Sequence, residues 1–531
     1  MDLQKKPVIA SLVLIVGVLI TPLFFGCGAT KVSTQGVLRL RLSGEPSVLN
    51  PLLTTDASSS AVVSQIFSGL LRVNESLELE GDLATHWEVL NGGRRLVFHL
   101  RRDVKWHDGV PFTAKDVLFT FNAILDPKTN TVRRSDYIIN GKPIQFSSPR
   151  PDTVVVDLPS PYAPILYRMA MEILPAHLLG NADINTASFN RRPIGTGPFR
   201  FVTWRPNQFI QLDAYSGYYL GKPALKTILF RVIPEYNVAK ALLIKGDIDA
   251  LDGVSALDIA QLKKRPDLRV VTYDELLYSY MGFNLKNPHL SNRLVRQAVA
   301  HAIDRQAMIK MVLIGKGRVA DLPVSPLSWA SPSNPFHYAY QPTKSIQLLQ
   351  EAGYRRNPAG DWVKNGSPLS FTILVSKGGK AGPKNAEIIQ RYLKSVGIKV
   401  MIQQLEWQSF LSIITNKQDP KAFDMCILSW SLSPDPDAYS IWHSSQYPRG
   451  FNFVAYQNKR VDTLLEEARS TVHQPTRARI YHEAFRIIGE ELPYLFLYYP
   501  STITAYNHRL TGLSRPGPAG LFVRMEQVNA K

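Results

Sequence analysis

Catalysis, metal binding and disulfide cross-linking require residues that this sequence lacks or has in no useful pattern. Only two cysteines occur in 531 residues, Cys27 and Cys426, so no CxxC pair, cysteine zinc cluster or disulfide framework can form. The motifs HExxH and GxSxG are absent, and the eleven histidines show no spacing typical of metal ligands. We therefore expect no enzyme, no metal and no cofactor. Cys426, in the run FDMCILSW, is expected to be a buried core residue.

Clusters of like charge are also missing. Lysine and arginine number 61 against 43 aspartates and glutamates, a net charge of +18, yet no run of five like charges occurs. Nucleic-acid binding requires clustered cations, so we expect no nucleic-acid partner. Hydrophobic residues make up 45% and charged residues 20%, which is typical of a folded globular protein. A chain of this length predicts roughly two to four domains.

A long apolar run occurs only near the start of the chain. Two lysines precede the apolar residues 8–25, and the run is followed by Gly26 and Cys27. This order is typical of a secretory signal peptide, residues 1–26, of the kind that precedes a lipid-modified cysteine. An uncleaved anchor is the alternative, since about 18 apolar residues is the lower limit for crossing a bilayer. We expect lipidation of Cys27 and a location outside the cytoplasmic membrane, in the periplasmic space or on the cell surface.

Segments typical of strands and of helices alternate along the rest of the chain, which predicts an α/β fold. Residues 38–42 alternate apolar and charged side chains, and YLFLYY from Tyr494 is a last apolar strand. Residues 370–376, 385–395 and 399–406 predict a strand, a helix and a strand, a unit that implies a parallel sheet. Because no long linker rich in glycine or serine occurs, we expect domains joined by several short crossings, which suits hinge closure around a ligand.

Three motifs invite a chemical interpretation, and a structural one is favoured for each. His107 beside Asp108 could be a general base, but no nucleophile motif accompanies it, so a surface turn is favoured. The segment GTGP from Gly195 resembles a phosphate loop superficially, but Pro198 lacks a backbone N–H, so a strand entry or interdomain crossing is favoured. The segment DPDAY from Asp435 lacks the glycine and the distal glutamate of a calcium loop.

Seven segments occur along the chain in an order that identifies a family. They are EPSVLNPL from Glu45, residues 83–117, which end in KWHDGVPFTAKDV, IGTGPFRF from Ile194, YMGFNL from Tyr280 with VRQAVAHAIDR from Val295, LLQEAGY from Leu348, LSWSLSPDPDAYSIW from Leu428 and ELPYLFLYY from Glu491. Together they resemble the family 5 extracellular solute-binding proteins, the dipeptide, oligopeptide and nickel receptors of ABC importers. The resemblance covers nearly all of the chain after the signal peptide.

The resemblance implies a two-lobe periplasmic-binding-protein fold (type II, cluster C). Lobe I would comprise residues 27–66, 194–280 and 495–531, with an extra subdomain at 67–193, and lobe II residues 281–494. The implied function is that of a monomeric receptor which captures a peptide between the lobes and delivers it to an ABC permease with its ATPase subunits. An oligosaccharide, a nickel chelate or an opine is the alternative ligand. A secreted hydrolase and a lipid-anchored chaperone or sensor are the alternatives from other classes.

One departure from the family concerns the expected ligand site. In peptide receptors of the family, an aspartate three residues after the tryptophan of this segment pairs with the peptide α-ammonium, whereas here Ser433 follows Trp430 at that place. A buried ammonium without a carboxylate is costly. Either Asp435 replaces the aspartate, or the ligand has no free amino group; alternatively, Asp435 caps a helix near Ala438. The expected ligand-binding residues are Trp430, Ser431, Ser433 and Asp435 from lobe II and Ser47 and Asn50 from lobe I.

Overall fold

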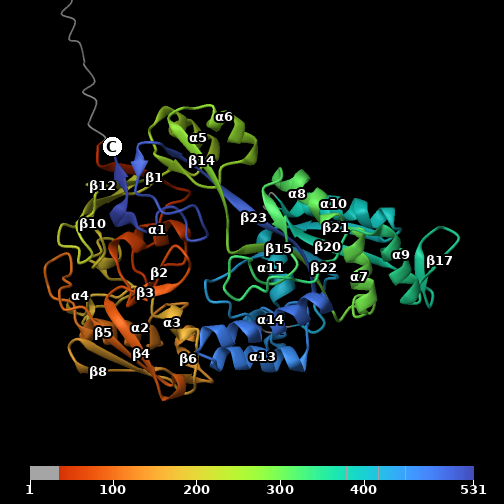
Figure 1. Cartoon of the computed structure of the whole chain (residues 1–531), viewed down its shortest axis with the longest axis horizontal. Coiled ribbons are helices and arrows are strands. Elements are labelled where there is room, and N and C mark those ends of the chain that lie inside the picture. Colours follow the sequence, from red (N-terminus) through yellow and green to blue (C-terminus); the bar gives the residue numbers. More distant parts are fainter. Residues whose placement is uncertain (1–34, 378–380, 417, 449) are drawn as a thin grey trace, which may run out of the picture.

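The computed structural model describes residues 35–377, 381–416, 418–448 and 450–531, and Figure 1 shows their arrangement. The expected signal peptide, residues 1–26, and the expected lipid site at Cys27 lie outside the described residues. No described helix combines the length and the hydropathy that crossing a bilayer requires. Two groups of helices and strands lie side by side, joined by the long strand β23 (Tyr494–Asn507) (Figure 1).

One sheet of 12 strands runs through both groups. Its order is β10-β11-β12-β1-β13-β23-β15-β22-β20-β21, and β14 and β16 also pair with β23. The other strands of this sheet are β1 (Val37–Leu42), β10 (Phe199–Arg205), β11 (Phe209–Ala214), β12 (Thr227–Val232), β13 (Ala250–Leu251), β14 (Leu268–Asp274), β15 (Leu277–Phe283), β16 (Gly317–Val319), β20 (Ser370–Ser376), β21 (Lys399–Leu405) and β22 (Met425–Ser431). The alternation in residues 38–42 predicted β1, and that prediction is confirmed.

Strand β23 belongs to both ends of this sheet. Its first part, from Tyr494 to Tyr498, pairs with β15, whereas its last part, from Ser501 to Asn507, pairs with β14. Buried apolar side chains form two clusters on each side. Those on one side come from residues 38–268 and 503–530, and those on the other side come from residues 278–499. We use lobe I and lobe II for these two sides. The chain crosses between them at residues 275–276 and again within β23.

Lobe I contains a second sheet of four strands in the order β4-β5-β9-β8. Helix α2 (Ala114–Leu125) lies against this sheet and begins at a capping box formed by Thr113 and Asp116. The strands are β4 (Ala84–Leu90), β5 (Arg95–Leu100), β8 (Gln145–Arg150) and β9 (Thr153–Asp157). The other elements are α1 (Ala57–Ile66), β2 (Leu71–Val73), β3 (Leu79–Gly81), β6 (Ile138–Ile139), β7 (Lys142–Pro143), α3 (Ile165–Arg168), α4 (Ala176–Leu179), α5 (Tyr236–Lys245), α6 (Ile259–Lys263), β24 (Leu510–Thr511) and β25 (Asn529–Ala530).

Lobe II contains the predicted strand–helix–strand unit. Strands β20 and β21 are parallel and are connected by α10 (Gly382–Ser395), which confirms the α/β class for this region. The other elements are α7 (Arg293–Ala302), α8 (Arg305–Leu313), α9 (Pro342–Glu351), β17 (Arg355–Arg356), β18 (Trp362–Lys364), β19 (Ser367–Pro368), α11 (Trp407–Thr415), α12 (Tyr439–Trp442), α13 (Lys459–Ser470) and α14 (Gln474–Glu491). Cys426 is buried as predicted, and burial raises the pKa of its thiol to about 12, so the thiol is inert.

Candidate functional site

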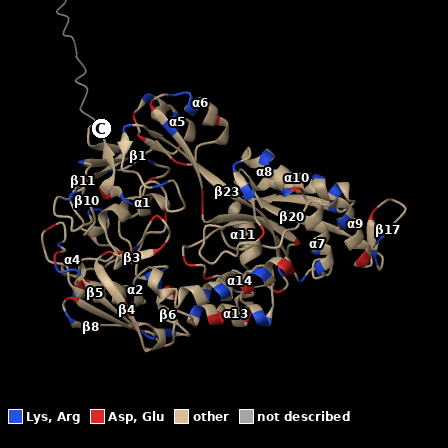
Figure 2. Cartoon of the chain, in the orientation of Figure 1, with Lys and Arg blue, Asp and Glu red and all other residues tan. Residues whose placement is uncertain are grey.

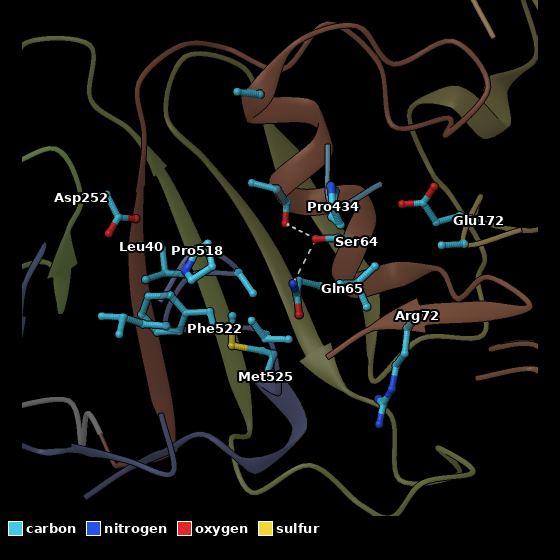
Figure 3. A pocket seen from close by; sticks show the side chains of 18 of the residues that line it. Leu40, Ser64, Gln65, Arg72, Glu172, Asp252, Pro434, Pro518, Phe522 and Met525 are labelled. Atoms are coloured by element: carbon cyan, nitrogen blue, oxygen red, sulfur yellow. Dashed lines mark hydrogen bonds between the residues drawn. The ribbon is translucent and has the colours of Figure 1, made fainter. Parts of the chain in front are cut away.

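A cavity of about 1150 Å³ lies where the two lobes meet. Most of its lining comes from lobe I, in particular from β1, α1, β2 and residues 518–526. Lobe II contributes Leu277, Ser431, Leu432 and Pro434, and the crossing at residues 275–276 lies beside them. We call the lobe I side of the cavity the wall and the four lobe II residues the rim (Figure 3).

Helix α1 forms the central part of the wall, and its start is fixed by Asp56. The Asp56 carboxylate accepts hydrogen bonds from the Ser59 backbone N–H at 2.7 Å and from the Ser47 hydroxyl at 2.6 Å. Partial burial raises the pKa of Asp56, but the hydrogen bonds from Ser47 and Ser59 outweigh it and lower the pKa below its usual value. A charged N-cap also interacts favourably with the helix dipole, so this end of the wall is well anchored.

The other end of α1 is fixed by a close backbone contact. A Cβ on Gly195 would lie 1.9 Å from the carbonyl oxygen of Ile66, and one on Gly197 would lie 2.6 Å from that of Gln65. The Gly197 N–H also donates to the Ile66 carbonyl oxygen at 2.8 Å. Only glycine allows so close an approach, which explains the GTGP segment structurally. The two glycines therefore allow close packing against the end of α1, and phosphate binding is not needed to explain them.

His107 connects the turn at residues 106–110 to the same glycine segment. The Gly195 N–H donates to His107 Nδ1 at 3.2 Å, so Nε2 carries the proton and donates to the Gly197 carbonyl oxygen at 3.0 Å. Burial lowers the pKa of His107 to about 4, and the imidazole is neutral at pH 7. The predicted turn is confirmed, but the ring lies against the glycine segment and both of its nitrogens are occupied. His107 is a structural residue.

The cavity lining carries five carboxylates and two guanidinium groups, namely those of Asp82, Glu172, Asp252, Glu275, Glu526, Arg41 and Arg72. Several of them neutralise one another. Arg72 pairs with Glu80 at 2.6 Å and with Glu526 at 3.3 Å. Burial raises the pKa of Asp82 to about 6, although a hydrogen bond from Tyr219 and the charge of Arg72 partly oppose this.

Three of these carboxylates have no cationic partner within hydrogen-bonding distance among the described residues. Asp252 accepts a hydrogen bond from the Thr504 hydroxyl, and Glu275 accepts one from the Thr502 hydroxyl. Glu172 accepts no hydrogen bond from the side chain or backbone of another described residue. Sequence reasoning missed all three, because they are single acidic residues in apolar or mixed segments and belong to no motif.

The rim contains only one of the ligand-binding residues expected in lobe II. Ser431 lines the cavity. Trp430 does not, because successive residues of a strand point to opposite faces, and its ring stacks between those of Tyr280 and Phe453 in the lobe II core. The Ser433 hydroxyl donates to the Asp435 carbonyl oxygen at 2.5 Å and closes the turn that follows the rim.

Asp435 is already paired within lobe II. Its two carboxylate oxygens accept from the Arg477 guanidinium at 2.5 and 2.8 Å, and the side chains of the two residues are only 5% and 4% exposed. It does not cap α12, since the Tyr439 N–H donates to Asp437 instead. The carboxylate that the sequence offered as a replacement for the missing aspartate is therefore occupied by an arginine.

The two residues expected in lobe I lie behind the wall. Ser47 holds Asp56 at the start of α1, and Asn50, which is fully buried, donates from its side-chain amide to the Asn190 side-chain oxygen at 2.9 Å. Neither residue lines the cavity. Both position the segment that leads into α1, so the structure brings only Ser431 of the expected set to the cavity, and their roles in ligand binding stay a prediction.

One group of metal-binding side chains comes together on the outer sheet of lobe I. His86 and Glu88 of β4 and His99 of β5 have their ligand atoms within 4.8 Å of one another. Sequence spacing could not reveal the group, because it depends on cross-strand register. The two imidazole rings stack with centroids 4.2 Å apart at an angle of 11°. Ring nitrogens coordinate metals along the plane of the ring, so two parallel rings cannot share one ion in this arrangement.

Comparisons with known proteins support the resemblance. The model of the bacterial extracellular solute-binding proteins, family 5 Middle, matches residues 78–451. The chain is 36% identical to the oligopeptide-binding protein AppA of Bacillus subtilis over 497 residues, which cover 91% of this chain and 90% of AppA. The structure of AppA from Bacillus subtilis with a nonapeptide is similar with a TM-score of 0.75 and 34% identity, over 94% of this chain and 99% of AppA. NikZ from Campylobacter jejuni with Ni(L-His) is similar with a TM-score of 0.77 and 29% identity, over 93% and 99%.

Proposed function

The chain belongs to the bacterial extracellular solute-binding proteins of family 5, and from this premise we propose that it is the receptor of an ABC importer, which captures peptides in the cavity between its lobes. Proteins of this family bind solutes and are not catalytic, and this chain is not an enzyme. The permease and its ATPase subunits would be its protein partners. The bound peptide would be released to the permease when the lobes separate.

The cavity itself is the observation that carries the peptide proposal. Its volume of about 1150 Å³ exceeds the roughly 300–1000 Å³ that small-molecule sites occupy. An extended peptide rises by about 3.3 Å per residue, so a cavity of this size has room for several residues. The similarity to AppA, whose structure holds a nonapeptide, supports the same class of ligand.

Closure of the lobes would take place at the two crossings, residues 275–276 and the middle of β23. Glu275 and Thr502 come from different crossings, and the Thr502 hydroxyl donates to the Glu275 carboxylate. At the far side of the molecule the lobes meet at a small contact, where the Ala163 N–H donates to the Arg469 carbonyl oxygen at 2.7 Å. Two crossings and a small distant contact suit a hinge motion around a ligand.

Lipid attachment at Cys27 would keep the receptor beside its permease. The apolar residues 8–25 and the cysteine that follows them support this proposal. Mass spectrometry of the membrane-bound protein should find a lipid-modified N-terminal cysteine, and Cys27→Ser should release the protein into the soluble fraction. The proposed domain ranges and a monomeric state complete this picture. Limited proteolysis and light scattering would test them.

The experiment for the proposed function is recovery of the bound ligand. The chain without residues 1–30 is incubated with a mixed peptide pool, washed and denatured, and the released molecules are identified by mass spectrometry. Peptides are the expected result. An oligosaccharide or a metal chelate in their place would overturn the peptide class but keep the transport role. Cleaved peptides in the wash would contradict a non-catalytic receptor, and absence of any saturable ligand would favour a chaperone or sensor.

A further inference from the structure

The charge of the cavity is opposite to that of the whole chain. The chain carries a net charge of +18, and lysine and arginine are spread over the elements of both lobes (Figure 2). The cavity lining, in contrast, has five carboxylates and two guanidinium groups. Arg72 is neutralised by Glu80 and Glu526, and Arg41 donates to the carbonyl oxygens of Ile233 and Pro234. A cavity with such an excess of acidic groups attracts cations and repels anions.

Glu172 differs from the other acidic groups of the lining in having neither a hydrogen-bond donor nor a cation from another described residue at its carboxylate. Its backbone forms a β-bridge with Gly69, and its neighbours Met171 and Ile173 are buried in the lobe I core, so the backbone position is fixed. The side chain leaves this core and its carboxylate points into the cavity (Figure 3). No other described residue donates a hydrogen bond to it, and no described cation lies within salt-bridge distance of it.

The surroundings of Glu172 disfavour its charge. Burial raises the pKa of the carboxyl group above its usual value, and the hydrogen bond from its own N–H and the charge of Arg133 only partly oppose this. Arg133 is directed elsewhere, because its guanidinium donates to the Pro51 carbonyl oxygen at 3.0 Å. An unpaired, partly buried carboxylate is costly, and a cationic group placed beside it removes that cost. The carboxylate can therefore accept a positively charged partner, which none of the residues that the structure describes supplies.

A second acidic region lies across the cavity. Asp252 is on the opposite side of the view from Glu172, with Ser64 and Gln65 of α1 between them (Figure 3). Among the described residues, Asp252 accepts a side-chain hydrogen bond only from the Thr504 hydroxyl, and the nearby crossing carries Glu275. The acidic character is thus spread over the length of the cavity, and it favours ligands with more than one cationic group.

We propose that the ligand is a cationic peptide and that Glu172 binds one of its ammonium or guanidinium groups. This inference rests on the proposed function and names the charge class of its substrate. Glu172 would thereby take the part for which the sequence offered Asp435, whose carboxylate is held by Arg477. A charge-assisted hydrogen bond from the ligand to Glu172 would fix its position in the cavity.

The test compares three synthetic peptides of equal length and apolar content, one with two lysines, one without charged side chains that is N-acetylated and C-amidated and therefore neutral, and one with two glutamates. Their affinities for the full chain are measured by isothermal titration calorimetry. We expect the lysine peptide to bind most tightly and the glutamate peptide most weakly. Glu172→Gln should lower the affinity for the lysine peptide about ten- to a hundredfold and leave the affinity for the neutral peptide unchanged. Added salt should narrow the difference between the peptides.

Glu387→Gln is the matched control, because Glu387 is an exposed carboxylate of α10 that does not line the cavity. It should leave all three affinities unchanged, and a normal melting curve should show that Glu172→Gln is folded. If the wild-type chain binds the neutral and lysine peptides equally, or if Glu172→Gln binds the lysine peptide with unchanged affinity, this inference is overturned and the proposed function stands. If no peptide of any charge binds, both are overturned.

Discussion

The acidic residues on the two sides of the cavity have different partners. Behind the rim, Asp435 pairs with Arg477 and Asp437 pairs with Arg469 at 2.7 Å. On the wall and at the crossing, Glu172, Asp252 and Glu275 have no arginine or lysine within salt-bridge distance among the described residues. The two sides also differ in how their backbones are fixed. Ion pairs hold the segment behind the rim, whereas α1 of the wall is held by close packing against the glycine segment.

This difference separates carboxylates that serve the fold from those that serve a ligand. A buried carboxylate that an arginine satisfies with two hydrogen bonds has no capacity left for a ligand cation, and its loss leaves the arginine uncompensated. An unpaired carboxylate does not stabilise the fold and is free to bind a cationic group of a ligand. A carboxylate near the cavity is therefore not by itself evidence for a binding role. Whether it already has a cationic partner within the fold determines whether it can bind a ligand.

Removal of the paired carboxylate should have the largest effect. Asp435→Asn leaves the Arg477 guanidinium, 4% exposed, without its counter-charge. Breaking one side of a buried pair typically costs about 3–5 kcal/mol in the free energy of unfolding. Denaturant unfolding of the wild-type and variant chains at pH 7 measures this loss.

The control for Asp435→Asn removes one side of a solvent-exposed ion pair. Arg460 and Glu483 pair at 2.9 Å on the surface of α13 and α14, and Glu483→Gln should not change the unfolding curve measurably. If Asp435→Asn were equally silent, the pair behind the rim would be as weak as a surface pair, and the division between structural and ligand carboxylates would fail.

Much of the fold could be predicted because it depends on local patterns. Alternation predicted β1, and periodicity predicted the unit of β20, α10 and β21. The run from Tyr494 predicted only the start of β23. The strand continues through residues 501–507, in which polar and apolar side chains are mixed, and these residues pair with β14 and carry the chain into lobe I. Apolar content alone could not show that extension, because the pairing partner lies more than 200 residues earlier in the sequence.

The site was harder to predict because it depends on contacts between distant segments. Asp435 looked available for a ligand in the sequence, since its partner Arg477 lies 42 residues further on, in α14. Trp430 was placed at the cavity, but strand alternation turns it into the lobe II core. Glu172 gave no signal beyond a single acidic residue in the apolar run MAMEILP. A carboxylate inside such a run is the one sequence feature that could have marked it, since acidic residues are rarely buried without a reason.

Disturbing the packing that holds the wall should have an intermediate effect. Gly195→Ala places a Cβ against the Ile66 carbonyl oxygen, and overpacking of this kind typically costs about 1–3 kcal/mol. Because α1 must move to make room, ligand affinity should fall as well. Gly382→Ala is the matched control, since a Cβ there meets no atom within 4 Å. Equal unfolding curves and affinities for the two variants would show that the wall does not depend on this contact.

Removal of the unpaired carboxylate should have the smallest effect on stability and the opposite sign. The pKa of Glu172 is raised in the folded state, so the folded protein holds this proton more tightly than the unfolded chain does. The stability of the wild-type chain should therefore fall as the pH rises above the unfolded value of about 4.5. Glu172→Gln lacks this titration and should be more stable than the wild type at pH 8, with the difference vanishing near pH 4. Denaturant unfolding of both chains at several pH values measures the difference. A loss of stability at pH 8 would mean that Glu172 has a cationic partner within the fold, and the contrast with Asp435 would disappear.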